Sequence, residues 1–583
     1  MKRKLLQRVK LTSVILLIVC TGQVHAQQTQ GDNHHAVKIG FEKLSEDLER
    51  GAITRQHALV EQLRLTLDPG SASPQYLDDA GFIRCLTPVI TEYHNHRDDY
   101  DLDVTLAMDD LLFSTRNHSE SYTSPSGKFV LYYSVDGNHA VPASDADMNG
   151  IPDYIEKAAV YADSSWNYMV NGLGFPEFIT PDRKYNIFFE DIRSYGYTMP
   201  TGNQSTSIVV HSTFEGFPEN RDPDGHRLGS LKVTLAHEIK HAVQYTVNQW
   251  KGVSGYLNWL EMDATMMENV VFSDVKDYYN YLGSQSVFSA PERSTPLAYS
   301  HATWMLFYAE HLGIDFWVDT WSRIGTGSGD MLASITEELQ NRNLTFGEMN
   351  TRNLLWHLAS GNFAPAGYGF SEKFDYPTPT LVQTFSDVKF VTYGHDRSLN
   401  KLSANFFMIE PPAGENGIAH IRVMSHNGVP GAGVLIYLKN GDVAEYLATD
   451  DGSGTLIVPT GRSWEEIEKI GIAVVNSSHD TGMDYTVEVE TTELPLAAEL
   501  DQNYPNPFNP STTIRFTMPS SGNASLVIYD ILGRRVTTLF SNREFSAGTQ
   551  LVEFNASDLA SGVYLYRLAT DSGIQTRKMT LLK

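Results

Sequence analysis

The feature that most limits how this chain can fold is a change of sequence pattern at about residue 375. Between about 121 and 375, strand-like runs such as 129–135 and 185–189 give way to long helical patterns, which is typical of an α+β domain. After residue 375, short strand-like runs alternate with turns of Gly, Pro, Asn and Asp, which predicts β-sandwiches. The sequence therefore predicts a multidomain chain with an α+β domain at 121–375 and two all-β sandwich domains at 376–493 and 494–583.

The first 26 residues have the three-part pattern of a secretory signal peptide. Five basic residues at positions 2–10 precede an apolar run at 11–20, and Val24-His25-Ala26 ends in a small residue suited to cleavage. A membrane anchor is the alternative, but the apolar run is shorter than the roughly twenty residues that cross a bilayer. We therefore expect a signal peptide at 1–26, a mature chain without a transmembrane span, and a secreted or cell-surface protein.

Net charge and cysteine content exclude one class of partner and one source of stability. Removal of residues 1–26 lowers the formal net charge from −26 to −31, because five basic and no acidic residues leave. So acidic a chain is not expected to bind nucleic acid. Of the two cysteines, Cys20 lies in the signal peptide and Cys85 remains, so the mature chain has no internal disulfide.

The run His237-Glu238-Ile239-Lys240-His241 carries the clearest chemical signal in the sequence. On a helix, His237 and His241 share a face and can bind one Zn²⁺, while Glu238 lies beside a zinc-bound water. A hydrolytic zinc site needs a third protein ligand and an open fourth position. Glu261, twenty residues after His241 on a second predicted helix, is the ligand that the spacing favours, and Glu268 is its rival.

An HExxH motif followed by a Glu on a downstream helix resembles the gluzincin, or thermolysin-like, peptidases. The metzincin pattern fails because Gln244 and Val247 stand where it has Gly and His. Residues 129–315 also resemble a family of secreted bacterial metalloproteases. These resemblances imply a zincin-like domain with Zn²⁺ as cofactor and Glu261 as third ligand. One departure is Thr265, which stands where thermolysin-like enzymes have an Asp that orients a zinc histidine.

The predicted ligand set suggests a mechanism. Zinc lowers the pKa of its water toward about 7 and polarises the scissile carbonyl, while Glu238 takes the proton and returns it to the leaving amine. Tyr299 and His301 are candidates to stabilise the developing oxyanion, although such residues are more often packing groups. We therefore expect a secreted zinc endopeptidase that acts on protein or peptide substrates. The alternatives are a non-catalytic adhesin or glycan-binding protein, and a zinc hydrolase of a non-peptide bond.

A twelve-residue run at 145–156 has the pattern of a calcium-binding loop. Side-chain oxygens recur at positions 1, 3, 5, 9 and 12, and Gly150 stands at position 6. The predicted Ca²⁺ ligands are Asp145, Asp147, Asn149, the carbonyl of Ile151, Asp153 and Glu156. The proline at position 8 departs from the helix-loop-helix form. A helix-capping turn without metal is the alternative.

Residues 27–120 form a predicted helical N-terminal segment and a candidate propeptide. Cys85 lies within it. A thiolate at this position could occupy the open zinc coordination place and keep the enzyme latent. The alternative, which the sequence favours, is a small buried hydrophobic side chain.

The last domain begins with a proline-rich run, 503–510, which cannot form a central strand. Its sequence Asn-Tyr-Pro-Asn-Pro-Phe-Asn-Pro, together with 528–534, 561–564 and 578–583, resembles the C-terminal sorting domain of type IX secretion substrates. The resemblance implies that the type IX secretion machinery is a partner. It also implies passage across the outer membrane.

Overall fold

The computed structural model describes residues 40–583 apart from gaps at 78–80, 115, 181, 203–204, 252–255, 328–329, 387–389, 394–397, 412–416, 450–451 and 496. The predicted signal peptide at 1–26 lies outside the described residues. The chain divides into a first unit of residues 1–286 and 296–342 and a second unit of residues 287–295 and 343–583. Among the described residues, no helix is both long and apolar enough to cross a membrane.

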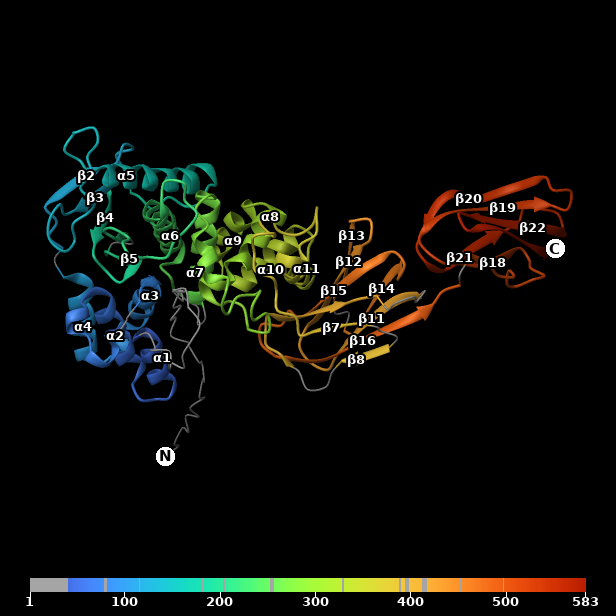
Figure 1. Cartoon of the computed structure of the whole chain (residues 1–583), viewed down its shortest axis with the longest axis horizontal. Helices are drawn as coiled ribbons and strands as arrows, with labels where there is room; N and C mark the ends of the chain where they lie inside the picture. Colours follow the sequence, from blue (N-terminus) through green and yellow to red (C-terminus); the bar gives the residue numbers. More distant parts are fainter. Residues whose placement is uncertain are drawn as a thin grey trace, which may run out of the picture. The chain divides into compact units, whose positions relative to one another are not determined.

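The first unit is built on a six-stranded mixed sheet with the order β1-β5-β6-β4-β3-β2. Figure 1 labels β2, β3, β4 and β5 of this sheet. The strands are β1 (Ile83–Cys85), β2 (Glu120–Thr123), β3 (Phe129–Tyr133), β4 (Tyr185–Glu190), β5 (Ser194–Pro200) and β6 (Thr206–His211). β3, β4 and β6 run parallel to one another, whereas β5 is antiparallel to β6. β1 is an edge strand and pairs in parallel with β5.

Helices cover this sheet and extend beyond it. They are α1 (Gly40–Glu49), α2 (Arg55–Leu67), α3 (Thr87–His96), α4 (Leu102–Phe113), α5 (Asp153–Trp166), α6 (His226–Asn248), α7 (Tyr256–Val271), α8 (Ala302–Leu312), α9 (Asp315–Thr326) and α10 (Met331–Asn341). α6 packs on β5 and β6 and is flanked by α5, α7 and α9. Within the predicted segment 27–120, the described residues 40–113 contain β1 and α1–α4. From here on, the N-terminal segment means residues 40–113.

α6 is the buried central helix of the first unit. From Gly229 to Tyr245 every side chain except that of Lys232 is buried, so the polar groups on this helix need partners inside the protein. The close approach of β5 depends on Gly196. A Cβ atom there would lie 2.8 Å from the Val209 carbonyl oxygen and 3.3 Å from Cγ of Glu238. The missing side chain therefore lets strand β5 lie directly beside Glu238.

The second unit begins with a β-sandwich of two sheets. Their strand orders are β13-β12-β15-β10-β7 and β14-β11-β16-β8, and β9 pairs with β16. The strands are β7 (Gln383–Phe385), β8 (Phe390–Tyr393), β9 (Ser398–Leu399), β10 (Ser403–Ile409), β11 (Gly417–Ser425), β12 (Pro430–Leu438), β13 (Val443–Thr449), β14 (Thr455–Ser463), β15 (Ile467–Asn476) and β16 (Met483–Glu493). Trp464, Ile472 and Val487 are among the buried residues between the sheets.

Helix α11 (Phe346–Leu358) belongs to this second unit, although the sequence pattern assigns its residues to the α+β domain. It packs on β12 and β15. Glycines make the contact close, since a Cβ atom at Gly433 would lie 3.3 Å from Leu355 and one at Gly471 would lie 3.0 Å from Leu358. The row of small residues on the sheet is a tertiary feature that helical periodicity alone does not reveal.

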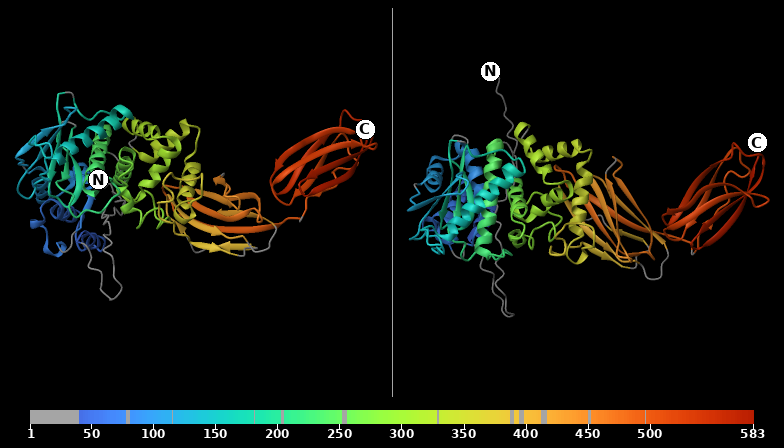
Figure 2. Two further views of the ribbon diagram at one scale, coloured as in Figure 1. Left: turned by 45° about the horizontal axis from the view of Figure 1, so that its top comes forward. Right: turned by 90° about the horizontal axis from the view of Figure 1, so that it is seen from above.

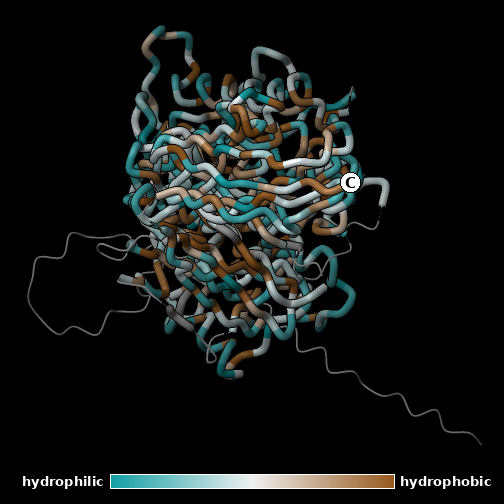
Figure 3. The backbone as a smooth tube through the Cα atoms, turned by 90° about the vertical axis from the view of Figure 1, so that its right-hand side faces the viewer, coloured by the Kyte–Doolittle hydropathy of each residue, from teal (hydrophilic) through white to brown (hydrophobic). Residues whose placement is uncertain are grey.

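A second sandwich ends the chain. Its sheets have the orders β17-β18-β21 and β20-β19-β22-β23. The strands are β17 (Glu499–Leu500), β18 (Ser511–Met518), β19 (Gly522–Asp530), β20 (Arg535–Phe545), β21 (Gly548–Asn555), β22 (Gly562–Thr570) and β23 (Gly573–Leu581). On β18, Ile514 and Phe516 are buried while Arg515 between them is exposed. Figure 3 shows hydrophobic and hydrophilic residues interspersed along the backbone near the C-terminus.

Both sandwiches, the first drawn in yellow to orange and the second in red, are entirely β in the views of Figure 2 apart from their connecting loops. The predicted organisation, an α+β part followed by all-β sandwiches, is confirmed at this level.

Candidate metal centre

Two helices bring three predicted ligands together. His237 and His241 lie one turn apart on α6, and their Nε2 atoms are 3.0 Å apart. Glu261 on α7 places Oε2 3.2 Å from Nε2 of His237 and Oε1 3.1 Å from Nε2 of His241. All three side chains are buried. The structure thus brings Glu261, and not its rival Glu268, to the two Nε2 atoms.

Hydrogen bonds on the far side of each imidazole fix which ring nitrogen carries a lone pair. Nδ1 of His237 lies 2.7 Å from a carboxylate oxygen of Glu268, which is an acceptor, so Nδ1 is the protonated nitrogen. Nδ1 of His241 lies 2.7 Å from Oε1 of Gln244, whose Nε2 donates to Asp263 at 2.7 Å and thereby fixes the amide orientation. Both Nε2 atoms therefore face the carboxylate of Glu261 and each other, so a cation, either a proton or a metal ion, is needed between them.

The pKa values of His237 and Glu261 also indicate that a cation belongs between these side chains. Burial alone would lower the pKa of His237, but hydrogen bonds and charges of Glu261 and Glu268 raise this pKa to about 10. Burial would raise the pKa of Glu261, but the two histidines hold it well below its usual range. A proton at this place performs the role that a metal ion would perform.

Cys85 supplies a fourth donor that the sequence assigned only as an alternative. One ligand atom each from Cys85, His237, His241 and Glu261 lies within 4.8 Å of the others. Burial, and then the nearby carboxylates of Glu238 and Glu261, raise the pKa of the Cys85 thiol, an effect that a bound divalent cation would reverse. One thiol, two imidazoles and one carboxylate are ligands that suit a tetrahedral zinc ion.

Glu238, the predicted general base, lies next to this group. Thr198 on β5 donates from Oγ1 to its Oε2 at 2.8 Å. Thr87 also donates to Oε2, at 3.3 Å, and Cys85 Sγ donates to Oε1 at 3.2 Å. Both carboxylate oxygens are therefore engaged, and two of the three partners come from the N-terminal segment.

Arg84, next to Cys85 on β1, is buried and makes two ion pairs. It contacts Glu268, and its Nη1 lies 2.5 Å from Oδ2 of Asp277. Its guanidinium also stacks 4.1 Å from the ring centre of Tyr195. Glu268 binds both Arg84 and His237. The ion pair therefore connects the N-terminal segment to the carboxylate that orients His237, a candidate metal ligand.

The proposed oxyanion donors lie on a short helical turn, Ala298–His301. The Tyr299 ring centre is 6.1 Å from that of His237, and Tyr299 packs in one buried cluster with Cys85, Tyr281 and Ala298. His301 is also buried at the end of this turn. Tyr299 therefore lies beside the metal group, and the catalytic roles of both residues stay predictions.

The predicted calcium loop runs into the first turn of α5, which begins at Asp153, and residues 146–150 of the loop are exposed. Asn149 Nδ2 donates to Asp147 at 3.0 Å and to Glu156 at 2.8 Å, while Asp145 accepts from the Gly150 amide at 2.9 Å. The Asp153 carboxylate accepts from the Ala146 amide at 3.0 Å. The amide of Ile151 donates to Asn149 at 2.8 Å. The carboxylates of the loop thus accept hydrogen bonds from other groups of the same loop. Calcium binding stays a prediction.

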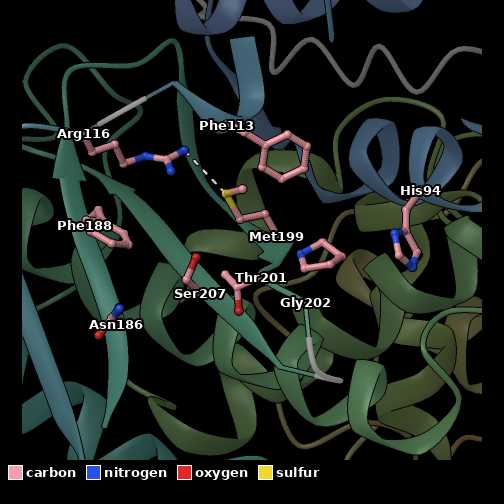
Figure 4. Close-up of a pocket in the computed structure, with 10 residues that line it drawn as sticks. His94, Phe113, Arg116, Asn186, Phe188, Met199, Thr201, Gly202 and Ser207 are labelled. Atoms are coloured by element: carbon pink, nitrogen blue, oxygen red, sulfur yellow. Dashed lines mark hydrogen bonds between the residues drawn. The ribbon is translucent and has the colours of Figure 1, made fainter. Parts of the chain in front are cut away.

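A pocket of about 450 Å³ lies on the first unit between the N-terminal segment and the sheet (Figure 4). Its lining consists of His94, Phe113, Arg116, Asn186, Phe188, Met199, Pro200, Thr201, Gly202 and Ser207. Arg116 donates to Met199 Sδ at 3.4 Å and stacks over Phe188. None of the four clustered donor residues lines this pocket, so the hollow and the metal group are separate features.

Several supporting residues were missed from sequence. Gln244 had a usable signal, because position i+3 from His241 lies on the same side of the helix. Thr198 and Arg84 act through contacts between distant parts of the chain, which no local spacing reveals.

We expect the change Gln244→Leu to weaken metal binding by about 10- to 100-fold, because His241 loses the acceptor that fixes its tautomer. The measurement is a competition titration with a zinc chelator. Thr246→Ala, an exposed change on the same helix, serves as the matched control and is expected to leave the affinity unchanged. Equal affinities for Gln244→Leu and the unchanged protein would show that this hydrogen bond does not support a metal ligand.

Several solved structures resemble parts of the chain at low identity and low TM-score. The Faecalibacterium prausnitzii β-glucuronidase matches at 8% identity and a TM-score of 0.12, over 32% of this chain and 38% of that chain. Apo β-glucuronidase 3 of Bacteroides uniformis matches at 13% identity and a TM-score of 0.11, over 30% and 26%. Tripeptidyl peptidase 2 matches at 7% identity and a TM-score of 0.16, over 35% and 31%.

The chain thus spans between about a quarter and two fifths of the length of these enzymes. At such TM-scores the likeness carries no argument about fold or function. No curated protein matches the chain.

The family comparison confirms the prediction for the C-terminal sandwich. Residues 502–581 match the secretion system C-terminal sorting domain, and the match covers all of β18–β23 and the proline-rich run before them. The chain therefore carries a type IX sorting domain and is secreted through that system to the cell surface or the extracellular space.

Proposed function

We propose that the first unit is a zinc-dependent peptidase of the zincin type and that the chain acts on protein or peptide substrates outside the cell. The observation that carries the proposal is the convergence of two Nε2 atoms and the Glu261 carboxylate, 3.0 to 3.2 Å apart, beside Glu238. The arrangement of α6 against a sheet with an antiparallel strand β5 supports a zincin-like fold. The resemblance of the HExxH and Glu261 spacing to thermolysin-like peptidases adds further support.

His237, His241 and Glu261 would hold the zinc ion. When bound, the ion would lower the pKa of a water molecule and polarise the substrate carbonyl. Glu238 accepts the proton of the attacking water and returns it to the leaving amine. Thr198 keeps the Glu238 carboxylate in place by donating to its Oε2 atom. Glu268 and Gln244 hold the imidazoles in the tautomer that leaves each Nε2 free to bind.

The test uses the chain from residue 27 onward, with and without limited proteolysis of the N-terminal segment. We expect one zinc ion per chain, lost in His237→Ala, and cleavage of casein and of a peptide library that a chelator abolishes. Absence of a tightly held metal would favour the adhesin or glycan-binding alternative. Bound zinc without peptide cleavage in either form would favour a hydrolase of another bond.

A further inference from the structure

The N-terminal segment supplies the edge strand β1, which pairs with β5 next to the candidate metal centre. The amide of Ile83 donates to the Arg193 carbonyl at 3.1 Å, and the amide of Leu86 donates to the Gly196 carbonyl at 3.2 Å. The amide of Thr198 donates to Oγ1 of Thr87 at 2.9 Å. An extended peptide that added a strand to this edge would need the same backbone groups of β5. While β1 is in place, these groups are not available to a substrate.

The same segment also closes the metal group. Cys85 brings its Sγ atom within 4.8 Å of the ligand atoms of His237, His241 and Glu261, where an open coordination place would be needed for hydrolysis. His237, Glu238, His241 and Glu261 each retain at most 2% of their accessible surface. A centre of this kind is closed to solvent, which is typical of a structural zinc site and not of a working hydrolase.

The buried ion pairs of Arg84 hold β1 beside β5. Arg84 ion-pairs with Glu268 and Asp277 on the other side of the group, and its side chain is 1% exposed. A buried cation with two acidic partners is costly to separate from them, so this contact fixes the adjacent Cys85 in register. Three residues close together in sequence thus contact the metal centre. Arg84 pairs with Glu268, Cys85 lies among the ligand atoms, and Thr87 donates to Glu238.

We propose that the N-terminal segment is a built-in inhibitor, in which Cys85 binds the metal as fourth ligand and β1 blocks the substrate edge of β5. The inference rests on the proposed function, because it assumes that the same centre hydrolyses peptides once opened. A bond forms between sulfur and zinc, the bond between zinc and water breaks, and the thiol proton passes to solvent. No oxidant or reductant takes part. The thiolate takes the place of the attacking water, so the segment itself is not hydrolysed.

The first test is X-ray absorption at the zinc edge of the uncut chain from residue 27 onward, loaded with zinc alone. Cys85 is the single cysteine in this chain, so the source of a thiolate signal is unambiguous. We expect a sulfur shell at about 2.3 Å in addition to nitrogen and oxygen ligands. The shell should vanish in Cys85→Ala and persist in Ile83→Val, a matched change on the same strand. A spectrum of nitrogen and oxygen ligands alone in the unchanged protein overturns the proposal.

Peptide hydrolysis by the same proteins gives the second readout. We expect the uncut chain to be inactive, and Cys85→Ala or removal of the N-terminal segment to release activity. An uncut chain that is as active as Cys85→Ala overturns the inhibitor proposal and leaves the peptidase proposal standing. A sulfur shell without hydrolysis in any form supports the closed site and overturns the peptidase. Failure to bind zinc at all overturns both.

Discussion

Replacement of Glu238 by Gln is expected to lower kcat for peptide hydrolysis by about 10²- to 10⁴-fold, the usual contribution of a general base. Gln has nearly the same shape as Glu but cannot accept a proton from the attacking water. The metal should remain, because His237, His241 and Glu261 are unchanged. Kinetics of the chain after removal of the N-terminal segment, together with zinc content by mass spectrometry, check both parts of the expectation.

The matched control for this change is Glu338→Gln. Glu338 is also a buried glutamate of the first unit, but it pairs with Arg323 and Arg342 away from the metal group. Its replacement should leave kcat near that of the unchanged enzyme. Retention of full activity by Glu238→Gln would remove Glu238 from the mechanism, whereas loss of zinc would show that this carboxylate supports the metal centre instead.

Replacement of Arg84 by Ala is expected to lower the free energy of unfolding of the first unit by about 3 to 5 kcal/mol, as is usual when one partner of a buried ion pair is removed. The change leaves Glu268 and Asp277 buried close to each other without their shared cation. Urea unfolding followed by hydrogen exchange of peptides from β1 and α7 measures the loss and separates the first unit from the sandwiches.

Arg50→Ala is the control for the loss of an arginine from the same segment. The Arg50 side chain is 69% exposed, and its partner Asp47 is buried but keeps the hydrogen bond that it accepts from Tyr76, so removal of Arg50 should cost about 1 kcal/mol. A double replacement of Arg84 and Asp277 by apolar residues should recover part of the stability. A cost for Arg84→Ala no larger than that of Arg50→Ala would show that the buried pairs do not hold β1.

The sequence predicted the parts of the centre that depend on helix geometry. The spacing of His237 and His241 requires only one helical turn, and Glu261 was found because it lies on the following helix. Glu268 lies at i+7 from Glu261 and therefore on the same face of α7, so helix geometry made it a rival third ligand and did not predict its role as the partner of an imidazole. The structure places it on Nδ1 of His237, where it fills the orienting role for which Thr265 lacks a carboxylate.

Contacts that span the sequence were beyond prediction. β1 contains three residues and gains its strand geometry from pairing with β5, so no alternation marks it. For the same reason Cys85 alone looked like a small buried side chain, which is true of its burial but omits the neighbouring metal group. The sandwiches, by contrast, were predictable because alternating burial and turn residues are local signals.

The covalent link between α4 and β2 has a kinetic consequence for any such inhibitor. While residues 114–119 are intact, β1 is tethered to its site at an effective concentration on the order of millimolar. A single cut in that stretch leaves the residues that pair β1 with β5 unchanged, yet the rate at which the segment rebinds then depends on the concentration of released fragments. Fragment and enzyme would stay together in a narrow compartment and separate in open medium, so that dilution after export would decide when activity begins.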